Sequence, residues 1–314
     1  MAFVFSDQHI GEYHTRGYTV FRDLIPPRLL ADLRREADRG RPIARRLAGG
    51  NAQRLQPIAP HLDMRPFDEL DRLPVLQQAL AAIFEHDPGM VVDLSAAREH
   101  LGILYEPGDS PYCMGWHRDY RDLWPGIDLA KWQRLLLSPR MFNQTNVALY
   151  DDGCLWAVPG SHLRGDTPGE IRRFPDRPIP YPDVSRLTPE AAELTCRDYV
   201  RSMPGAEQVR LNAGDFMLYR NTLWHIGSYV PYVKRATIHG ALLTPEYQDF
   251  FAHDFKPVLD AWVAGDRRPF ENLNAHTAAY RAALPRIVAA RGWRRMHQAA
   301  GWLLPRVKRR LGLG

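Results

Sequence analysis

Apolar positions in the first 90 residues recur with the period of an α-helix. Residues 28–39 follow Pro26-Pro27 and carry leucines on one side and charges on the other, which predicts a helix with one buried face. Residues 74–86 place Leu76, Leu80, Ile83 and Phe84 at i, i+4, i+7 and i+8, which predicts a second such helix. Residues 17–21 form a short β-type run, and residues 40–60, rich in Arg, Gly and Pro, are expected to form an irregular loop.

From residue 90 the pattern changes to short apolar runs separated by Gly, Pro and Asp. The runs predict strands at residues 90–94, 101–106, 115–120, 144–150, 154–158, 208–211, 215–219, 223–226 and 235–243. Many short strands at close spacing are typical of an antiparallel sandwich or barrel. Residues 164–202, rich in Pro and Arg, are expected to form a long loop over one mouth of the barrel.

These elements predict one domain over residues 1–314, of mainly β fold with flanking helices (α+β). It comprises a helical lead-in over 1–89, a β core over about 90–245, and an extension over 246–314 with predicted helices at 275–291 and 293–311. Hydrophobic content of 45% and charged content of 25% fit an ordinary globular protein. Without a long apolar run or a secretory signal pattern, and with cysteines in no Cys-x-x-Cys pair, we expect a cytoplasmic protein with reduced thiols.

The formal net charge of +5 comes from the C-terminal tail. Residues 291–314 contain Arg291, Arg294, Arg295, Arg306, Lys308, Arg309 and Arg310 and no Asp or Glu, so the rest of the chain is close to neutral. We therefore expect no nucleic-acid partner. The tail interleaves these cations with tryptophans and leucines, as interfacial helices do. Weak peripheral membrane contact through this helix, and packing of a solvated terminal helix on the barrel, both stay open.

Three residues have the character of a metal site. His117 and Asp119 are two positions apart, so in an extended segment their side chains share one face. His225 lies 108 residues after His117, in a predicted strand. Two histidines and one carboxylate form the facial triad of non-haem Fe(II) oxygenases, which leaves three metal positions open. Those positions suit a bidentate oxo-acid and O₂.

A candidate anchor for the oxo-acid follows ten residues after His225. A strand leaving His225 and turning near Pro231 would return antiparallel and place Arg235 a short reach from the metal. A buried guanidinium binds a carboxylate in a bidentate fork, and Thr237 on the same face would add a hydroxyl. The arrangement suits 2-oxoglutarate, with its keto-acid end on iron and its far carboxylate on Arg235.

The sequence resembles the phytanoyl-CoA dioxygenase (PhyH-like) family of Fe(II)/2-oxoglutarate oxygenases over roughly residues 10–245. The carrying residues are Trp116-His117-Arg118-Asp119-Tyr120, then Asn146 through Pro159-Gly160-Ser161-His162, and Gly214-Asp215 through His225 to Arg235. The resemblance implies a double-stranded β-helix (jelly roll) core. It implies that His117, Asp119 and His225 bind iron and that Arg235 binds 2-oxoglutarate. Halogenating relatives lack the carboxylate, so Asp119 implies oxygen transfer.

Further site residues follow from strand alternation and the resemblance. The family places a polar residue near 2-oxoglutarate on the strand at 144–150, which makes Asn146, with Gln144 behind it, the candidates, while Thr145 stays open. Tyr120 and Trp124 are the candidate substrate contacts. His162 is expected to bond backbone, His239 to be a satisfied core histidine, and Cys113 to be structural. Arg118, Arg121 and the arginines of residues 164–201 would favour an anionic substrate.

The predicted activity is hydroxylation of an unactivated C–H in a small-molecule metabolite or biosynthetic intermediate, with Fe(II), 2-oxoglutarate and O₂. Desaturation or cyclisation uses the same triad and stays open. The alternatives from other classes are a non-catalytic jelly-roll metal-binding protein and a cupin-like metal enzyme that uses no oxo-acid. Arg235 separates the last of these, because a cupin without a cosubstrate needs no carboxylate anchor.

Overall fold

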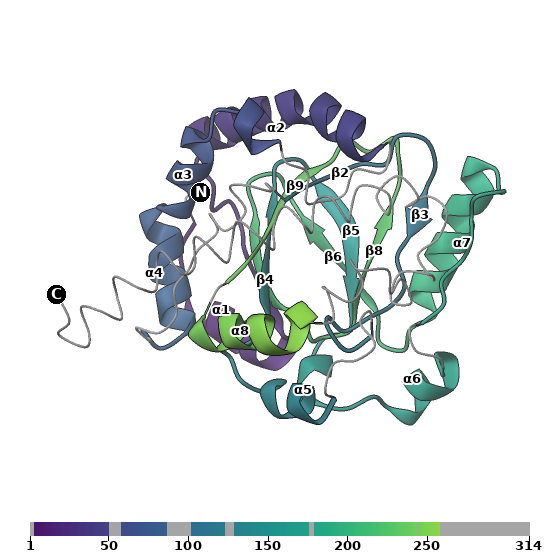
Figure 1. The fold of residues 1–314 in the computed structure, drawn as a ribbon. Helices are drawn as coiled ribbons and strands as arrows, with labels where there is room; N and C mark the ends of the chain where they lie inside the picture. Colours follow the sequence, from purple (N-terminus) through teal and green to yellow (C-terminus); the bar gives the residue numbers. More distant parts are fainter. Residues whose placement is uncertain are drawn as a thin grey trace.

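Two antiparallel β-sheets face each other at the centre of the computed structural model (Figure 1). The structure describes residues 3–49, 58–86, 102–122, 129–175, 179–242 and 244–257. The larger sheet has the strand order β1-β7-β4-β9-β2 and the smaller one β3-β8-β5-β6. The strands are β1 (Tyr18–Phe21), β2 (Ile103–Tyr105), β3 (Tyr112–Cys113), β4 (Asn143–Ala148), β5 (Asp152–Ala157), β6 (Glu207–Leu211), β7 (Phe216–Arg220), β8 (His225–Tyr229) and β9 (Ala236–Ala241). The predicted jelly-roll core with flanking helices is confirmed.

Four helices cover the outer face of the larger sheet: α1 (Asp7–Arg16), α2 (Pro27–Ala48), α3 (Arg65–Asp71) and α4 (Pro74–Ile83), with a short 3₁₀ turn, η1 (Ala59–His61). Their apolar faces and the outer residues of β1, β2, β4, β7 and β9 form one buried cluster. In α4 the predicted stripe is confirmed, because Leu76, Leu80 and Ile83 are all buried. The helix α1, which was not predicted, ends at Gly17 in the left-handed region (φ +85°).

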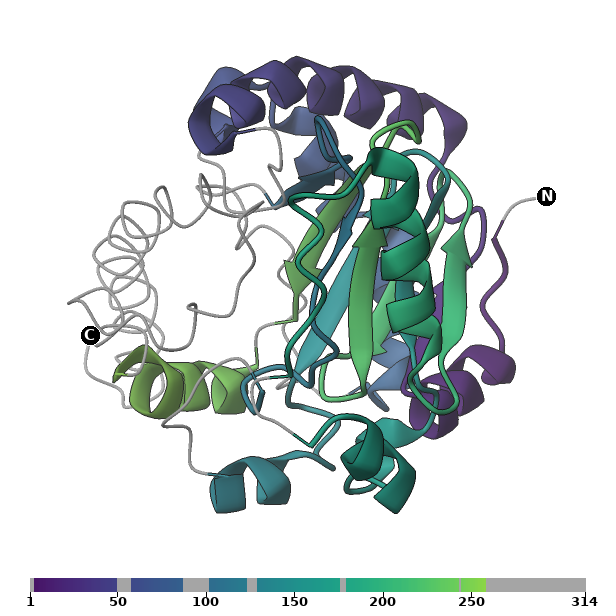
Figure 2. The same ribbon diagram turned by 90° about the vertical axis from the view of Figure 1, so that its right-hand side faces the viewer.

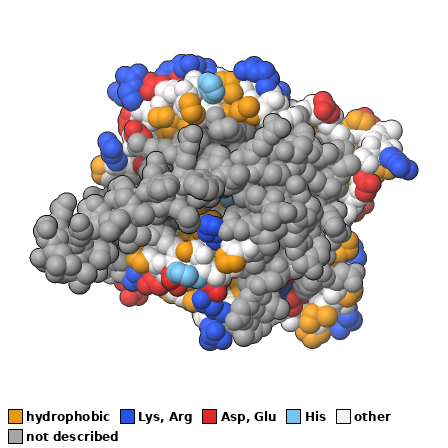
Figure 3. Space-filling view, in the orientation of Figure 1, with side chains coloured by type: hydrophobic (Ala, Val, Ile, Leu, Met, Phe, Trp, Pro, Cys, Tyr) orange, Lys and Arg blue, Asp and Glu red, His pale blue; other side chains and the backbone are white. Residues whose placement is uncertain are grey.

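The predicted loop over residues 40–60 is wrong in its first part, because α2 continues to Ala48. The buried face of the helix runs from Leu29 and Leu33 into Ala37 and Ala44, a weaker signal than leucines give. Arg41 and Arg45 of the added turns both pair with Glu106, just after β2. Along α2, Arg28 and Arg35 lie near Asp32, and Arg39 pairs with the buried Glu36. Figure 3 shows basic and acidic side chains mixed along the upper edge of the molecule.

The predicted loop over residues 164–202 is also wrong, because it contains α6 (Pro168–Arg173) and α7 (Pro189–Arg201). Each begins with a threonine whose hydroxyl accepts a backbone N–H and a proline in the first turn. In α7 the buried residues Ala192, Cys196 and Val200 recur every four positions and contact the smaller sheet. Figure 2 shows α7 in front of this sheet, with its axis running roughly along the strands.

The predicted strand over residues 115–120 is wrong, although its residues do meet β8. They form a single bridge, His117 with His225, and the strand that pairs with β8 on the side away from β5 is β3 instead. Tyr120 takes a positive φ of +68°, which ends any extended conformation there. The predicted strand at 90–94 and the predicted helices at 275–311 lie outside the described residues.

Below the sheets lie α5 (Leu129–Leu135), α8 (Pro245–Phe250) and a π-helical turn, η4 (Phe251–Phe255). Another 3₁₀ turn, η3 (Ser161–Leu163), follows β5. Within the described ranges, no helix has the length and apolar character to cross a membrane. Between the sheets, apolar side chains from β4, β5, β6 and β7 fill part of the space, and the polar residues described next occupy the rest.

Candidate metal and cosubstrate site

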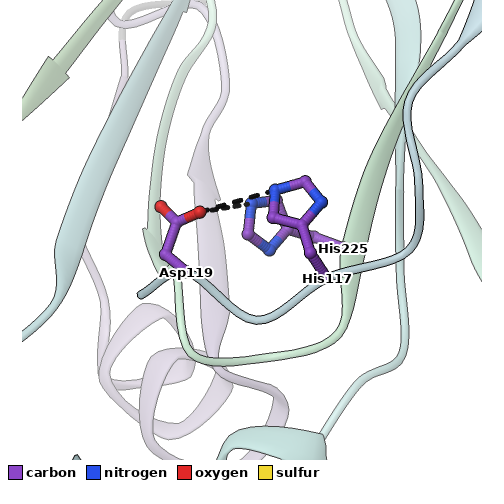
Figure 4. A group of neighbouring side chains, drawn as sticks. All are labelled: His117, Asp119 and His225. Atoms are coloured by element: carbon purple, nitrogen blue, oxygen red, sulfur yellow. Dashed lines mark ion pairs between the residues drawn. The ribbon is translucent and has the colours of Figure 1, made fainter. Parts of the chain in front are cut away.

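His117, Asp119 and His225 converge between the sheets, with one ligand atom of each within 4.8 Å of the others (Figure 4). Asp119 Oδ1 lies 3.4 Å from His117 Nε2 and 3.9 Å from His225 Nε2. Ligand bonds of about 2.1 Å at right angles would separate neighbouring ligand atoms by about 3 Å. Both separations from Asp119 Oδ1 lie within about 1 Å of that value, so the three side chains are arranged to hold one divalent ion on a common face.

The backbone forces the two histidines together. His117 N donates to His225 O at 3.2 Å and His225 N donates to His117 O at 3.1 Å, so the residues form a closely paired bridge. Their ring centroids are 4.3 Å apart. Each Nδ1 lies beside a backbone carbonyl, Gly115 O at 2.7 Å and Leu223 O at 3.0 Å. A carbonyl only accepts, so each Nδ1 carries the proton and each Nε2 presents its lone pair to a metal.

Gln144 reaches the carboxylate of Asp119 from the larger sheet. Its Nε2 donates to Asp119 Oδ2 at 2.6 Å, and its Oε1 accepts from the hydroxyl of Tyr219 at 2.6 Å. The structure thus places Gln144 beside the metal ligand, with both ends of its amide bonded. Tyr219 was missed by sequence reasoning, since it reads as an ordinary apolar strand residue until β4 and β7 are put in register.

Arg235 lies just before β9 and is 4% exposed. Its Nε donates to Asp152 Oδ2 at 2.8 Å, and its guanidinium lies 5.0 Å from the ring of Tyr229. Among the described residues, the buried Nη1 has no hydrogen-bond partner. A buried cationic N–H group without an acceptor is costly, so the position suits an incoming carboxylate.

Asp152 is the second residue that the sequence did not single out, since its Asp-Asp-Gly segment reads as a turn. Its Oδ2 also accepts from Thr237 Oγ1 at 2.5 Å, and its Oδ1 accepts from Cys154 N at 2.8 Å. Burial favours the neutral acid, but the charge of Arg235 and the hydroxyl of Thr237 outweigh burial and hold the pKa of Asp152 below its usual value. The Thr237 hydroxyl, predicted to meet 2-oxoglutarate, donates to Asp152 here.

The side chain of Asn146 contacts His239 between the sheets, with Oδ1 2.7 Å from His239 Nδ1. Because Gln144 and Ala148 on the same face also point between the sheets, alternation turns Thr145 toward the helices, where Val147 lies. Of the two candidates, Asn146 is therefore the one whose side chain lies between the sheets. A contact of Asn146 with 2-oxoglutarate stays a prediction.

Arg118 and Arg121, two of the arginines expected to favour an anionic substrate, are paired with carboxylates of the protein, and an anionic substrate stays a prediction. The fully buried Arg118 donates to the carbonyls of Ser161 and Thr222 and pairs with Asp166 at 3.3 Å, and burial lowers its pKa to about 10. Arg121 pairs with Asp122 and Asp166. In the insert, Arg164 likewise pairs with the buried Glu170.

Tyr120 lies in an aromatic cluster with Phe142, Phe250 and Phe255, and its hydroxyl is 2.5 Å from that of Tyr247. A substrate contact by Tyr120 stays a prediction, and Trp124 lies outside the described residues. His162 contacts backbone, as predicted, with Nε2 3.3 Å from His14 O.

Cys113 contacts Cys196 of α7. Hydrogen bonding to that cysteine and burial raise the pKa of the Cys113 thiol. Both cysteines are free thiols.

Comparisons with known proteins give one family match and several similar solved structures. Residues 13–229 match the family described as Phytanoyl-CoA dioxygenase (PhyH). No curated protein matches in sequence. AviO1 from Streptomyces viridochromogenes Tue57 is 18% identical with a TM-score of 0.48, covering 76% of this chain and 97% of its own. SnoK, titled a non-heme alpha ketoglutarate dependent carbocyclase from nogalamycin biosynthesis, is 16% identical with a TM-score of 0.47, covering 76% and 84%. The non-heme monooxygenase ThoJ, titled as a Ni complex, is 16% identical with a TM-score of 0.44, covering 85% and 99%.

The family match spans more than half of the chain and includes the His–Asp–His cluster. It confirms the resemblance on which the choice of iron, 2-oxoglutarate and O₂ was based. The chain belongs to the phytanoyl-CoA dioxygenase family of Fe(II)- and 2-oxoglutarate-dependent oxygenases.

Proposed function

We propose that this protein hydroxylates an unactivated C–H of a small-molecule substrate, with His117, Asp119 and His225 as the iron ligands and Arg235 as the anchor of 2-oxoglutarate. The observation that carries the proposal is the pairing of two features between the same sheets. The His–Asp–His cluster presents three ligand atoms within 4.8 Å, and Arg235 presents a buried Nη1 without an acceptor among the described residues. A metal site alone would not require that cation.

The donor set fits the group that the family implies. Two neutral imidazoles and one carboxylate bind Fe(II) and leave positions for a bidentate oxo-acid and for O₂. Bound iron and 2-oxoglutarate would supply the activation of O₂, with the oxo-acid leaving as succinate and CO₂ and one oxygen atom passing to the substrate. The chain's own part is to hold the ligands, orient the oxo-acid and limit water.

Each residue has one task in this scheme. The carbonyls of Gly115 and Leu223 hold the two rings in the ligand tautomer. Arg235 would bind the distal carboxylate of 2-oxoglutarate through its unpaired Nη1, while Asp152 holds the Nε edge of the guanidinium. Asp119 fills the position that an oxygen-transferring enzyme gives to a carboxylate, which favours oxygen transfer.

Anaerobic addition of Fe(II) and 2-oxoglutarate tests the assignment through the visible charge-transfer band of the chelate. We expect the band with wild type and with His253→Ala, which removes an exposed histidine. We expect no band with His225→Ala. Absence of the band in folded wild type would refute the proposal in favour of a metal-binding protein or an oxo-acid-independent enzyme.

Product mass distinguishes the possible reactions once a substrate is found. A gain of one oxygen atom supports hydroxylation. A loss of two hydrogen atoms would replace it by desaturation or cyclisation, for which the same triad serves.

A further inference from the structure

We infer that Gln144 and Tyr219 form a hydrogen-bonded relay that fixes Asp119 as a ligand through one oxygen only, so that Gln144 is a positioning residue for the metal. The inference rests on the metal site of the proposed function. The two carboxylate oxygens of Asp119 are not equivalent. Oδ1 faces both histidine Nε2 atoms, at 3.4 and 3.9 Å, whereas Oδ2 accepts from Gln144 Nε2 at 2.6 Å.

The difference between the two oxygens of Asp119 matters because it decides how many coordination positions of the metal stay open. An octahedral ion held by two imidazoles and one carboxylate oxygen keeps three positions open. If the carboxylate used both oxygens, two would remain, which is too few for a bidentate oxo-acid together with O₂. By engaging Oδ2, Gln144 opposes the second bond and keeps the third position available.

The direction of the relay is fixed by chemistry. The carboxylate of Asp119 only accepts, so the amide NH₂ of Gln144 faces it and Oε1 faces Tyr219. The Tyr219 hydroxyl therefore donates to Oε1. The carboxylate fixes the amide in this orientation, since a flipped amide would set its oxygen against Asp119, and the Tyr219 hydroxyl satisfies the other end of the amide.

The relay also connects the side chain of Asp119, whose segment is not a strand, to the larger sheet. Residues 114–122 form no strand and meet β8 through the His117–His225 bridge and the bond from Met114 N to Gly227 O, whereas Gln144 and Tyr219 are directly opposite each other in β4 and β7. β4 is paired on both sides, by β7 and β9. Both relay residues are buried, and the Tyr219 ring lies edge-on to His225 at 5.7 Å. The relay thus fixes the carboxylate to the central part of the larger sheet.

The test measures binding of Mn(II) to the metal-free protein by the EPR signal of the free ion. We expect Gln144→Ala to raise the Kd about 10- to 100-fold, as loss of an outer-shell partner does. Tyr219→Phe, which keeps the ring, should raise it less. The matched control is Tyr105→Phe, whose buried hydroxyl donates to Ala37 O outside the site and whose Kd should stay within about twofold of wild type.

An Asp119→Ala background separates positioning from a general loss of structure. There Gln144→Ala should change the Kd by less than about twofold, because its target is gone. If Gln144→Ala fails to fold, Tyr219→Phe decides: an unchanged Kd overturns the inference, and a raised one supports it. An unchanged Kd in folded Gln144→Ala also overturns it. Failure of wild type to bind Mn(II) through His117 and His225 would instead overturn the proposed function.

Discussion

Asp152→Asn tests the buried ion pair that holds Arg235. The substitution keeps the shape of the side chain and removes its charge. In the protein, Oδ2 accepts from Arg235 and Thr237, and Oδ1 accepts from Cys154 N. An amide has one oxygen, so if the substituted side chain keeps the first two bonds, its NH₂ group faces the N–H of Cys154. The variant therefore loses a charge and sets two donors against each other.

The expected cost is substantial. Removing one partner of a buried pair costs about 3–5 kcal/mol, and the bonds that the amide retains place the expected loss near the lower figure, about 3 kcal/mol. For a chain of 314 residues, with an unfolding entropy of about 2.1 cal/mol/K per residue, that corresponds to a fall in Tm of about 4–5 °C. The pKa of Asp152 is lowered in the folded state, so its contribution to stability is present above the unfolded pKa of about 3.9 and is lost as the pH falls through the folded pKa.

Differential scanning calorimetry of metal-free wild type and Asp152→Asn measures the difference. Asp151→Asn is the matched control, because Asp151 is exposed and accepts from Ala213 N through one oxygen, which an amide can replace. We also expect 2-oxoglutarate to bind Asp152→Asn more tightly, because a negative charge beside its distal carboxylate has been removed. A Tm within about 1–2 °C of wild type, or weaker binding of 2-oxoglutarate, would refute the reasoning.

Three further outcomes are expected. Arg235→Gln should raise the Kd of 2-oxoglutarate by roughly 100-fold while the Kd of Mn(II) stays unchanged. If calorimetric titrations give the same Kd of 2-oxoglutarate for the variant and wild type, Arg235 is not the anchor. Asp166→Asn should lower the Tm without altering the Kd of 2-oxoglutarate, since this carboxylate neutralises two arginines, Arg118 and Arg121, outside the site. A higher Kd of 2-oxoglutarate in this variant would contradict the placement of Asp166 outside the site. Burial and the nearby Arg220 lower the pKa of His162 to about 4, so stability should fall as the pH drops from about 6.5 to 4, and pH-dependent melting of His162→Gln should show a smaller fall.

Much of the site could be predicted from the sequence because its chemistry is local or repeated in a known pattern. His117 and Asp119 are two residues apart, and His225 opens a strand that the apolar pattern located. Alternation along β4 predicted that Gln144 and Asn146 share one face of the strand. Which face points inward could be decided only from the position of the second sheet. Tyr219 and Asp152 were not predicted, because the role of each depends on a partner about 80 residues away in the sequence. Tyr219 bonds to Gln144, and Asp152 bonds to Arg235.

The fold was predictable where side-chain periods are strong. The leucine stripe predicted the first half of α2, but Ala37 and Ala44 carry too little apolar contrast to extend it. In residues 164–202, the proline- and arginine-rich composition led to the prediction of a loop, although Ala192, Cys196 and Val200 recur with the four-residue period of a helix. The segment of Gly115–Tyr120 reads as a strand, yet Tyr120 takes a positive φ and packs against Phe142 and Phe250, distant residues that no local sequence pattern reveals.

The order of strands in the larger sheet has a consequence for synthesis of the chain. β1 is an edge strand whose partner is β7, with Tyr18 opposite Tyr219. At about 5–20 residues per second, the ribosome needs about 10–40 s to make the intervening chain. β9, the last of its strands to be made, then inserts between β4 and β2. Nascent chains that end before Phe216 therefore lack the partner of β1, and those that end before Ala236 leave the β9 side of β4 unpaired, an edge that is expected to pair with other chains.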